Sequence, residues 1–161
     1  MNAVGKKSVK LTIELVPSTC WYNNLRKYMS KAEWDRLRRS VYAEHGHRCA
    51  VCGAPGMMIC HEIWRYDDEK HIQTLTGFTA LCSMCDHVKH IGFAGILAKQ
   101  GKLDFNKVVE HFMQVNECDK AAFEAHYREA FAQWKVRSHH QWTTDLGEYS
   151  HLIKHKTSPN F

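Results

Sequence analysis

Two pairs of cysteines carry the clearest chemistry in this chain. Each pair has C-x-x-C spacing, and the four residues are Cys49, Cys52, Cys82 and Cys85. A C-x-x-C turn lets two thiolates reach one ion, and two such turns complete the tetrahedral shell of a structural Zn²⁺. The spacing therefore predicts one zinc site with four sulfur ligands, which would contribute folding free energy directly.

Further ligand-type side chains lie between and just after the two pairs, at His61, Asp86, His87 and His90. They cannot join a closed shell of four thiolates without displacing one, so we interpret them as a second, reactive metal site. Asp86 and His90 are four residues apart, which on a helix places them on one face and lets them hold one cation together. The carboxylate of Asp86 suits Mg²⁺ or Mn²⁺. His87 lies about 100° around such a helix and is expected to point elsewhere, toward a phosphate.

Periodicity and turn signals predict the elements that position these residues. They comprise two strands over 57–66 and 71–81, joined as a hairpin by a polar turn, and a helix over about 86–100. A cysteine turn, a hairpin, a second cysteine turn and a helix follow one another as in a treble clef. In that arrangement the first hairpin strand runs against the helix, so His61 is expected to face Asp86 and His90.

The flanking regions predict further elements around this centre. They are a half-buried strand over 8–16, a helix from the capping box of Ser30 and Glu33 to about Glu44, and amphipathic helices capped by Asp104 and Asp119. The tail over 137–161 has little periodicity and is expected to be a packed extension. Aromatic residues around Trp134 and Trp142 could serve a dimer contact, although the sequence leaves the oligomeric state open.

The length of 161 residues predicts one domain, and the predicted elements make it α+β. The motifs divide it into a zinc-knuckle core over 48–100, an N-terminal part over 1–47 and a helical extension over 101–161. The chain has no apolar run approaching a bilayer span, so no membrane association is expected. No apolar signal-peptide core is present either, which favours a cytoplasmic location and reduced thiols. The net charge of +5 is compatible with a nucleic-acid partner but is only mildly basic.

Together these residues resemble the HNH, or ββα-metal, endonucleases, and more narrowly a zinc-knuckle-bearing bacterial and phage type of them. The resemblance rests on Cys49-x-x-Cys52, on Cys60-His61-Glu62-Ile63-Trp64 and on Leu81-Cys82-x-x-Cys85-Asp86-x-x-Lys89-His90. It covers about residues 48–94, and a looser similarity extends through 15–24 and 131–147. It implies a treble-clef core in which two strands and a helix hold one divalent cation beside a structural zinc, with an N-terminal strand and helix and C-terminal helices.

The resemblance also implies roles for individual residues. His61 would be the general base that takes a proton from the water attacking the phosphorus. A Mg²⁺ or Mn²⁺ ion near His61, Asp86 and His90 would stabilise the phosphate and the leaving 3′-oxygen. Glu62 is a second acidic catalytic candidate, although strand alternation is expected to turn it away from His61.

The implied substrate is DNA, with RNA as an alternative, and several cationic side chains would contact its phosphates. We assign this contact to Arg65, His87 and Lys89, with Arg36, Arg38 and Arg39 on the earlier helix as a further basic cluster or as ordinary solvated charges. Each phosphate contact would release counterions, so binding would be sensitive to salt.

Two positions depart from the pattern of the family. Cys60 stands where an aspartate often binds the metal, and Gly77 stands where an asparagine orients the base. Gln73 or Thr79 could orient His61 instead. The sequence therefore leaves a second function open, a catalytically weak or inactive zinc-stabilised module that binds nucleic acid or a protein partner. A zinc deaminase is disfavoured, because its H-x-E and P-C-x-x-C motifs do not occur here.

Overall fold

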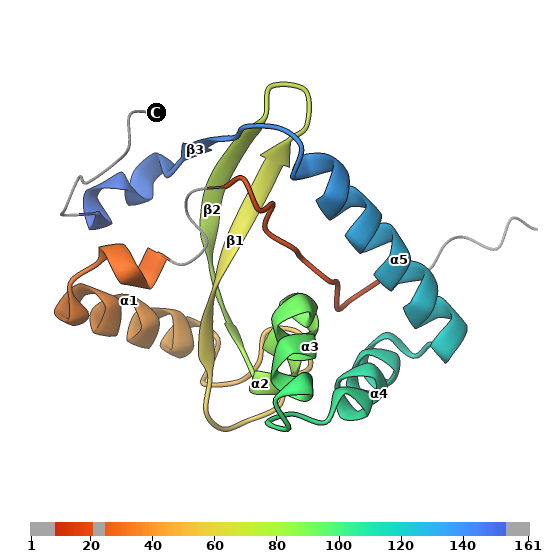
Figure 1. Cartoon of the computed structure of the whole chain (residues 1–161). Coiled ribbons are helices and arrows are strands. Elements are labelled where there is room, and N and C mark those ends of the chain that lie inside the picture. The colour runs from red at the N-terminus through yellow and green to blue at the C-terminus, as the bar shows by residue number, and fades with distance from the viewer. Residues whose placement is uncertain (1–8, 21–24, 154–161) are drawn as a thin grey trace, which may run out of the picture.

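A twisted β-hairpin forms the centre of the molecule (Figure 1). The computed structural model describes residues 9–20 and 25–153. Strand β1 spans Ile59–Asp67 and pairs in antiparallel fashion with β2, Ile72–Leu81, which confirms the predicted hairpin. The register places His61 opposite Thr79 and shifts between Ile63 and Trp64. A short strand β3, Thr143–Asp145, adds to β2 in parallel, so part of the tail joins the sheet, which the sequence did not predict.

Helix α1, Lys31–Glu44, packs against the hairpin and begins where the capping box predicted. The hydroxyl of Ser30 accepts a hydrogen bond from the backbone N–H of Glu33 at 3.3 Å. The helix is followed by Gly46 with φ of 62°, a left-handed conformation that glycine adopts without strain. A 3₁₀ turn, η1 over Leu25–Tyr28, precedes α1.

The single helix predicted after the second cysteine pair is two helices in the structure. Helix α2 spans Ser83–Lys89 and α3 spans Ile91–Lys99, with His90 between them at φ −101° and ψ 47°. The N–H of His90 still donates to the carbonyl of Asp86 at 2.9 Å, and the carbonyl of His90 accepts from Ala94 at 3.0 Å. The chain therefore changes direction at this residue without leaving its backbone groups unpaired.

Two longer helices cover the side of the hairpin away from α1. Helix α4 spans Phe105–Asn116, and α5 spans Lys120–Arg137, with Asp104 and Asp119 as their N-caps, as predicted. Phe112 of α4 and Phe123 of α5 meet edge to face with ring centroids 5.2 Å apart. The aromatic stripes of both helices thus contribute to one core, which also contains residues from the N-terminal segment, the hairpin and α2.

The strand predicted over 8–16 is wrong for the described residues 9–16, which form an extended segment without a β-ladder. Its alternation is nevertheless visible, because Leu11 and Ile13 are buried. The segment runs between the hairpin and α5 (Figure 1). Helices rather than a sheet edge surround it, so side chains of those helices satisfy its backbone groups. Asn116 bonds to both the N–H and the carbonyl of Leu11, at 2.8 and 2.9 Å, and His126 accepts from the N–H of Ile13 at 3.0 Å.

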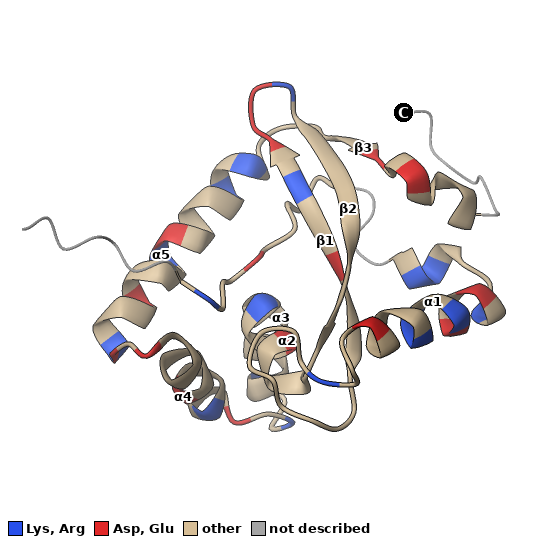
Figure 2. Cartoon of the chain, turned by 180° about the vertical axis from the view of Figure 1, so that it is seen from behind, with Lys and Arg blue, Asp and Glu red and all other residues tan. Residues whose placement is uncertain are grey.

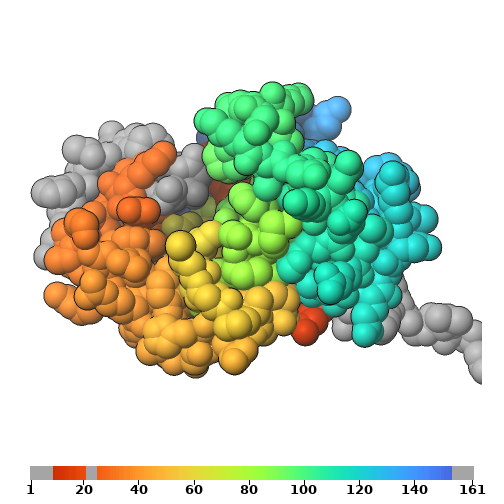
Figure 3. All heavy atoms as spheres, turned by 90° about the horizontal axis from the view of Figure 1, so that it is seen from below, coloured from red at the N-terminus to blue at the C-terminus, as the bar shows by residue number. Residues whose placement is uncertain are grey.

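Seen from below, the residues of α1 and those of α2 to α4 form two lobes on either side of the hairpin (Figure 3). A second small cluster of buried side chains, Leu25 and Leu75, lies where η1 meets the hairpin. Among the described residues, no helix is both long and apolar enough to cross a bilayer.

Candidate metal centres

The four paired cysteines converge as predicted. Their Sγ atoms all lie within 4.8 Å of one another, and those of Cys52 and Cys82 are 3.6 Å apart. Four sulfurs bound tetrahedrally to zinc at about 2.3 Å are about 3.8 Å from each other. The Cys49, Cys52, Cys82 and Cys85 group could therefore hold a structural zinc. We call it the sulfur site.

The local structure of both cysteine turns explains this convergence. Gly53, with φ of 75°, lets the first turn close, and its N–H donates to the carbonyl of Cys49 at 2.9 Å. In the second turn, Cys82 is the N-cap of α2 and its sulfur accepts from the N–H of Cys85 at 3.5 Å. Burial raises the pKa of Cys49, but backbone N–H groups of the turns outweigh it and bring that pKa down to about 7. These backbone groups therefore favour the thiolate form of Cys49, the form that binds metal.

A histidine that the sequence analysis did not single out lies beside the sulfur site. Nε2 of His111, on α4, is 3.2 Å from Sγ of Cys85. Burial and the neighbouring thiols raise the pKa of Cys85, so the Nε2–H tautomer of His111 would help to balance the charge of its thiolate. Nothing in the sequence pattern around His111 signalled this contact, because it depends on how α4 packs against α2.

The second predicted group also comes together. Nδ1 of His61 lies 3.2 Å from Nε2 of His90 and 3.5 Å from Oδ1 of Asp86, and the last two atoms are 3.6 Å apart. Donors bound to one cation at about 2.1 Å are separated by about 3.0–3.4 Å, depending on the coordination geometry. Two imidazoles and one carboxylate from β1 and the end of α2 therefore fit one divalent cation, with room for water on the open side. We call this group the histidine site.

The two histidines of this site have different environments. His61 is only 6% exposed, and burial opposes its charging, but hydrogen bonds with Asp86 and Glu14 outweigh burial and raise its pKa. The side chain of His90 is 40% exposed, yet burial of its ring and the proximity of His61 lower its pKa. His90 therefore stays neutral more readily and is the better metal ligand of the pair.

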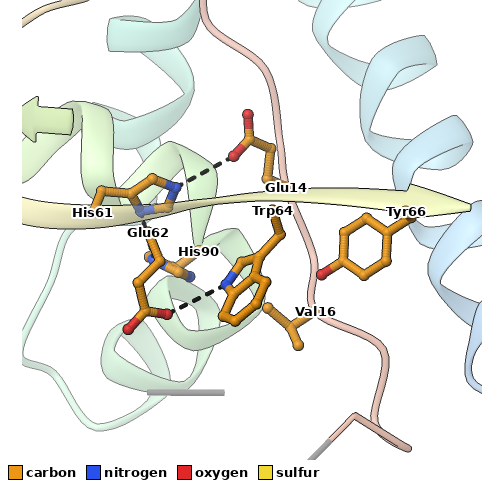
Figure 4. A pocket seen from close by; sticks show the side chains of 7 residues that line it. All are labelled: Glu14, Val16, His61, Glu62, Trp64, Tyr66 and His90. Atoms are coloured by element: carbon orange, nitrogen blue, oxygen red, sulfur yellow. Dashed lines mark hydrogen bonds and ion pairs between the residues drawn. The ribbon is translucent and has the colours of Figure 1, made fainter. Parts of the chain in front are cut away.

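A carboxylate that the sequence analysis missed completes the surroundings of His61. Oε2 of Glu14 lies 3.3 Å from Nε2 of His61 (Figure 4). Oε1 of Glu14 lies 2.8 Å from the ammonium of Lys89. Burial raises the pKa of Glu14, but His61 and Lys89 outweigh it and lower the value to about 2. In the sequence, the only signal for Glu14 is that it is one of the polar residues that alternate with apolar ones over 9–16.

The other predicted site residues are not part of the histidine site. Glu62 accepts hydrogen bonds from the N–H of Leu25 at 2.7 Å and from the indole of Trp64 at 3.3 Å. Lys89 is 7% exposed and also donates to Thr12, so its ammonium is engaged inside the protein rather than presented to a phosphate. Arg65 is exposed and His87 is half-buried.

The two positions that depart from the family pattern have simple structural roles. Cys60 is buried in the core, and burial raises its pKa to about 12, so it remains a thiol. Gly77 lies opposite Ile63 in the hairpin. Gln73 is fully buried and bonds to Tyr66 and Thr144, so it is engaged away from His61.

A cavity of about 40 Å³ adjoins the histidine site. Its walls are Glu14, Val16, His61, Glu62, Trp64, Tyr66 and His90 (Figure 4). The volume is enough for one or two water molecules next to His61 and too small for a nucleobase. Comparison with models of protein families, with curated proteins and with solved structures found no match to this chain.

Proposed function

We propose that this protein is a metal-dependent endonuclease of the HNH type that hydrolyses phosphodiester bonds of DNA. The observation that carries the proposal is the convergence of His61, Asp86 and His90 within 3.2–3.6 Å of one another. The group stands on a hairpin and a helix that follow cysteine turns, the chain order of a treble-clef, ββα-metal core. A structural zinc at the sulfur site would hold the two turns, and with them β1 and α2, at a constant separation.

The chemistry assigned to the site is an in-line displacement at phosphorus. Nδ1 of His61 accepts a proton from a water molecule as its oxygen bonds to phosphorus, and the bond from phosphorus to the 3′-oxygen breaks. The leaving oxygen then takes a proton from solvent. A divalent cation held by Asp86 and His90 would act as a Lewis acid on the phosphate, with Nδ1 of His61 free of the cation while it serves as the base. Its donors include imidazole nitrogen, so Mn²⁺ is expected to support cleavage better than Mg²⁺.

Exposed cationic side chains would provide contacts to the phosphate backbone. Arg65 projects from β1, and Arg36 and Arg39 are exposed on α1, where several Lys and Arg residues alternate with acidic ones (Figure 2). This mixed charge predicts moderate affinity that falls with rising salt concentration. His87, next to Asp86, remains the candidate for a contact close to the scissile phosphate.

Cleavage of supercoiled plasmid in the presence of Mn²⁺ or Mg²⁺ tests the proposal. We expect the wild-type protein to nick the plasmid, and His61→Ala and His90→Ala to lose about 10²–10⁴-fold in rate. Both variants should keep about one zinc per chain, since the sulfur site is separate. Asp68→Asn is the matched control, because it removes a carboxylate that pairs with Arg137 away from the site. Absence of metal-dependent cleavage of any DNA or RNA, or equal rates for wild type and His61→Ala, would contradict the proposal.

The deep burial of His61 favours one other function, a zinc-stabilised module that binds nucleic acid or a protein without cleaving. In that case zinc would be bound at the sulfur site alone. A gel-shift assay that finds tight nucleic-acid binding, combined with no measurable uptake of Mn²⁺, would support the module over the enzyme.

A further inference from the structure

We infer that Glu14, on the N-terminal segment outside the hairpin and helix that carry the histidine site, is the positioning residue for His61. It holds the imidazole in the tautomer whose unprotonated Nδ1 faces Asp86 and His90. This role rests on the proposed function. In the HNH pattern an asparagine at the position of Gly77 orients the base, and here Glu14 would orient it instead.

Two carboxylates flank the imidazole, and the closer one determines the tautomer of the neutral ring, because Oε2 of Glu14 lies 3.3 Å from Nε2 whereas Oδ1 of Asp86 lies 3.5 Å from Nδ1. An ionised carboxylate can only accept hydrogen bonds, so across the 3.3 Å contact with Oε2 of Glu14 the donor is Nε2 of His61 (Figure 4). A neutral imidazole carries one N–H, and once Nε2 bears it, Nδ1 has a free lone pair. That nitrogen points at Oδ1 of Asp86 and Nε2 of His90. Only in this tautomer can the nitrogen that faces Asp86 and His90 take a proton from water or bind a cation.

Glu14 is itself held in place from two directions. Its second oxygen accepts from the ammonium of Lys89 at 2.8 Å, and its backbone N–H donates to the carbonyl of Lys89 at 3.0 Å. Lys89 directly precedes His90 in the chain. The two contacts between Glu14 and Lys89 therefore connect the orienting carboxylate to the end of α2, beside His90. As a result, His61 and His90 keep a defined relative position.

Among the described residues, Glu14 is the carboxylate that faces Nε2 of His61, whereas Asp86 faces the other ring nitrogen, Nδ1. The carboxylate of Glu62 is used by Leu25 and Trp64, and the amide of Gln73 by Tyr66 and Thr144. A carboxylate that orients a metal-site histidine commonly changes metal affinity by about 10–100-fold when it is removed. Glu14 should therefore influence the histidine site without contacting the cation.

The first test measures the tautomer directly in the zinc-loaded full-length protein without a second metal. Long-range ¹H–¹⁵N NMR, recorded above the pKa of His61, should show the Nε2–H form in the wild type. In Glu14→Gln, Lys89 should attract the amide oxygen, which turns the amide NH₂ toward Nε2 and shifts His61 to the Nδ1–H form. A wild-type spectrum with the Nδ1–H form would overturn the inference, whether or not the variant folds.

The second test measures Mn²⁺ affinity by electron paramagnetic resonance on the same zinc-loaded protein. We expect Glu14→Gln to lose about 10–100-fold in affinity and Glu14→Asp, which keeps the charge, to recover part of it. Asp68→Asn, which removes the negative charge that pairs with Arg137 at 2.7 Å, should bind Mn²⁺ like the wild type. Wild-type affinity in Glu14→Gln would overturn the inference.

Neither readout depends on cleavage. If the tautomer and Mn²⁺ affinity respond as expected while plasmid remains intact, Glu14 positions His61 and the nuclease proposal is wrong. If plasmid is cut in a His61-dependent manner but Glu14→Gln changes neither readout, the nuclease proposal holds and the role of Glu14 is wrong.

Discussion

At the residue scale, three histidines show how neighbours decide what one type of side chain can do. His61 is buried between two carboxylates that raise its pKa, whereas burial lowers the pKa of His90 and of His111. His61 is thus the histidine most able to accept a proton. His90 and His111 stay neutral and suit a metal ligand and a donor to a thiolate, respectively.

The sulfur site yields a prediction at this scale. Cys85→Ser removes a fully buried thiol from the group of four that could hold zinc. The zinc content should therefore fall well below one per chain, and cooperative unfolding should be lost or shifted to much lower temperature. Thermal melting followed by circular dichroism, with zinc measured by atomic absorption, provides the readout.

Cys118→Ser is the matched control for that experiment. Cys118 is only partly buried and lies outside the four-cysteine group, so this variant should melt close to the wild type with its zinc retained. Equal behaviour of the Cys85 and Cys118 variants would contradict the structural zinc.

At the scale of elements, turns rather than long helices determine where the ligands lie. The first cysteine turn needs a left-handed residue at Gly53, and the change of direction at His90 separates α2 from α3. The backbone N–H of His90 still donates to the carbonyl of Asp86, so the two residues stay one helical turn apart. Their predicted proximity is therefore confirmed, although the predicted single helix is two helices. The spacing of apolar residues predicts that a stretch is helical, but it does not predict a change of direction at a single residue such as His90.

Two glycine substitutions test this view of the elements. A methyl group at Gly95, within α3, or at Gly53 would meet nothing within 4 Å, so only the backbone distinguishes the two positions. Gly95→Ala should raise the free energy of unfolding by about 0.5–1 kcal/mol, because alanine favours a helix. Gly53→Ala should lower it by about 1–2 kcal/mol, because φ there is 75°. Urea denaturation of the zinc-loaded proteins measures both, and equal effects would show that the first turn tolerates a left-handed alanine.

At the scale of the whole molecule, the C-terminal helices reach the histidine site through the N-terminal segment. Three side chains of α4 and α5 hold this segment by hydrogen bonds. Asn116 donates to the carbonyl of Leu11, His126 accepts from the N–H of Ile13, and Trp134 donates to the carbonyl of Val16 at 3.0 Å. Glu14 lies within the stretch so held. Helices α4 and α5 therefore contact the histidine site indirectly, through the segment that carries Glu14, and the sequence does not predict this connection.

Asn116→Ala tests this connection. It leaves the N–H and carbonyl of the fully buried Leu11 without partners, which should lower the free energy of unfolding by about 2 kcal/mol. Because the segment carries Glu14, Mn²⁺ binding at the histidine site should weaken too, while zinc content stays unchanged. Unaltered Mn²⁺ affinity in a destabilised variant would show that the position of Glu14 does not depend on Asn116.

Local patterns in the sequence determined a substantial part of this protein. The C-x-x-C spacing predicted the sulfur site, capping residues such as Ser30 predicted helix starts, and the placement of His61, Asp86 and His90 predicted a second group of ligands. Each of these signals works because its physical cause lies within a few residues of chain, or within one hairpin and the helix that follows it.

Only the tertiary structure decided what surrounds those ligands. Glu14 contacts His61 across 47 positions of sequence, and His111 contacts Cys85 across 26. The extended segment over 9–16 has the alternation of a strand, but helices surround it, so helix side chains replace a β-ladder. Partners of this kind are set by how elements pack, and no pattern within a short stretch of sequence encodes that packing.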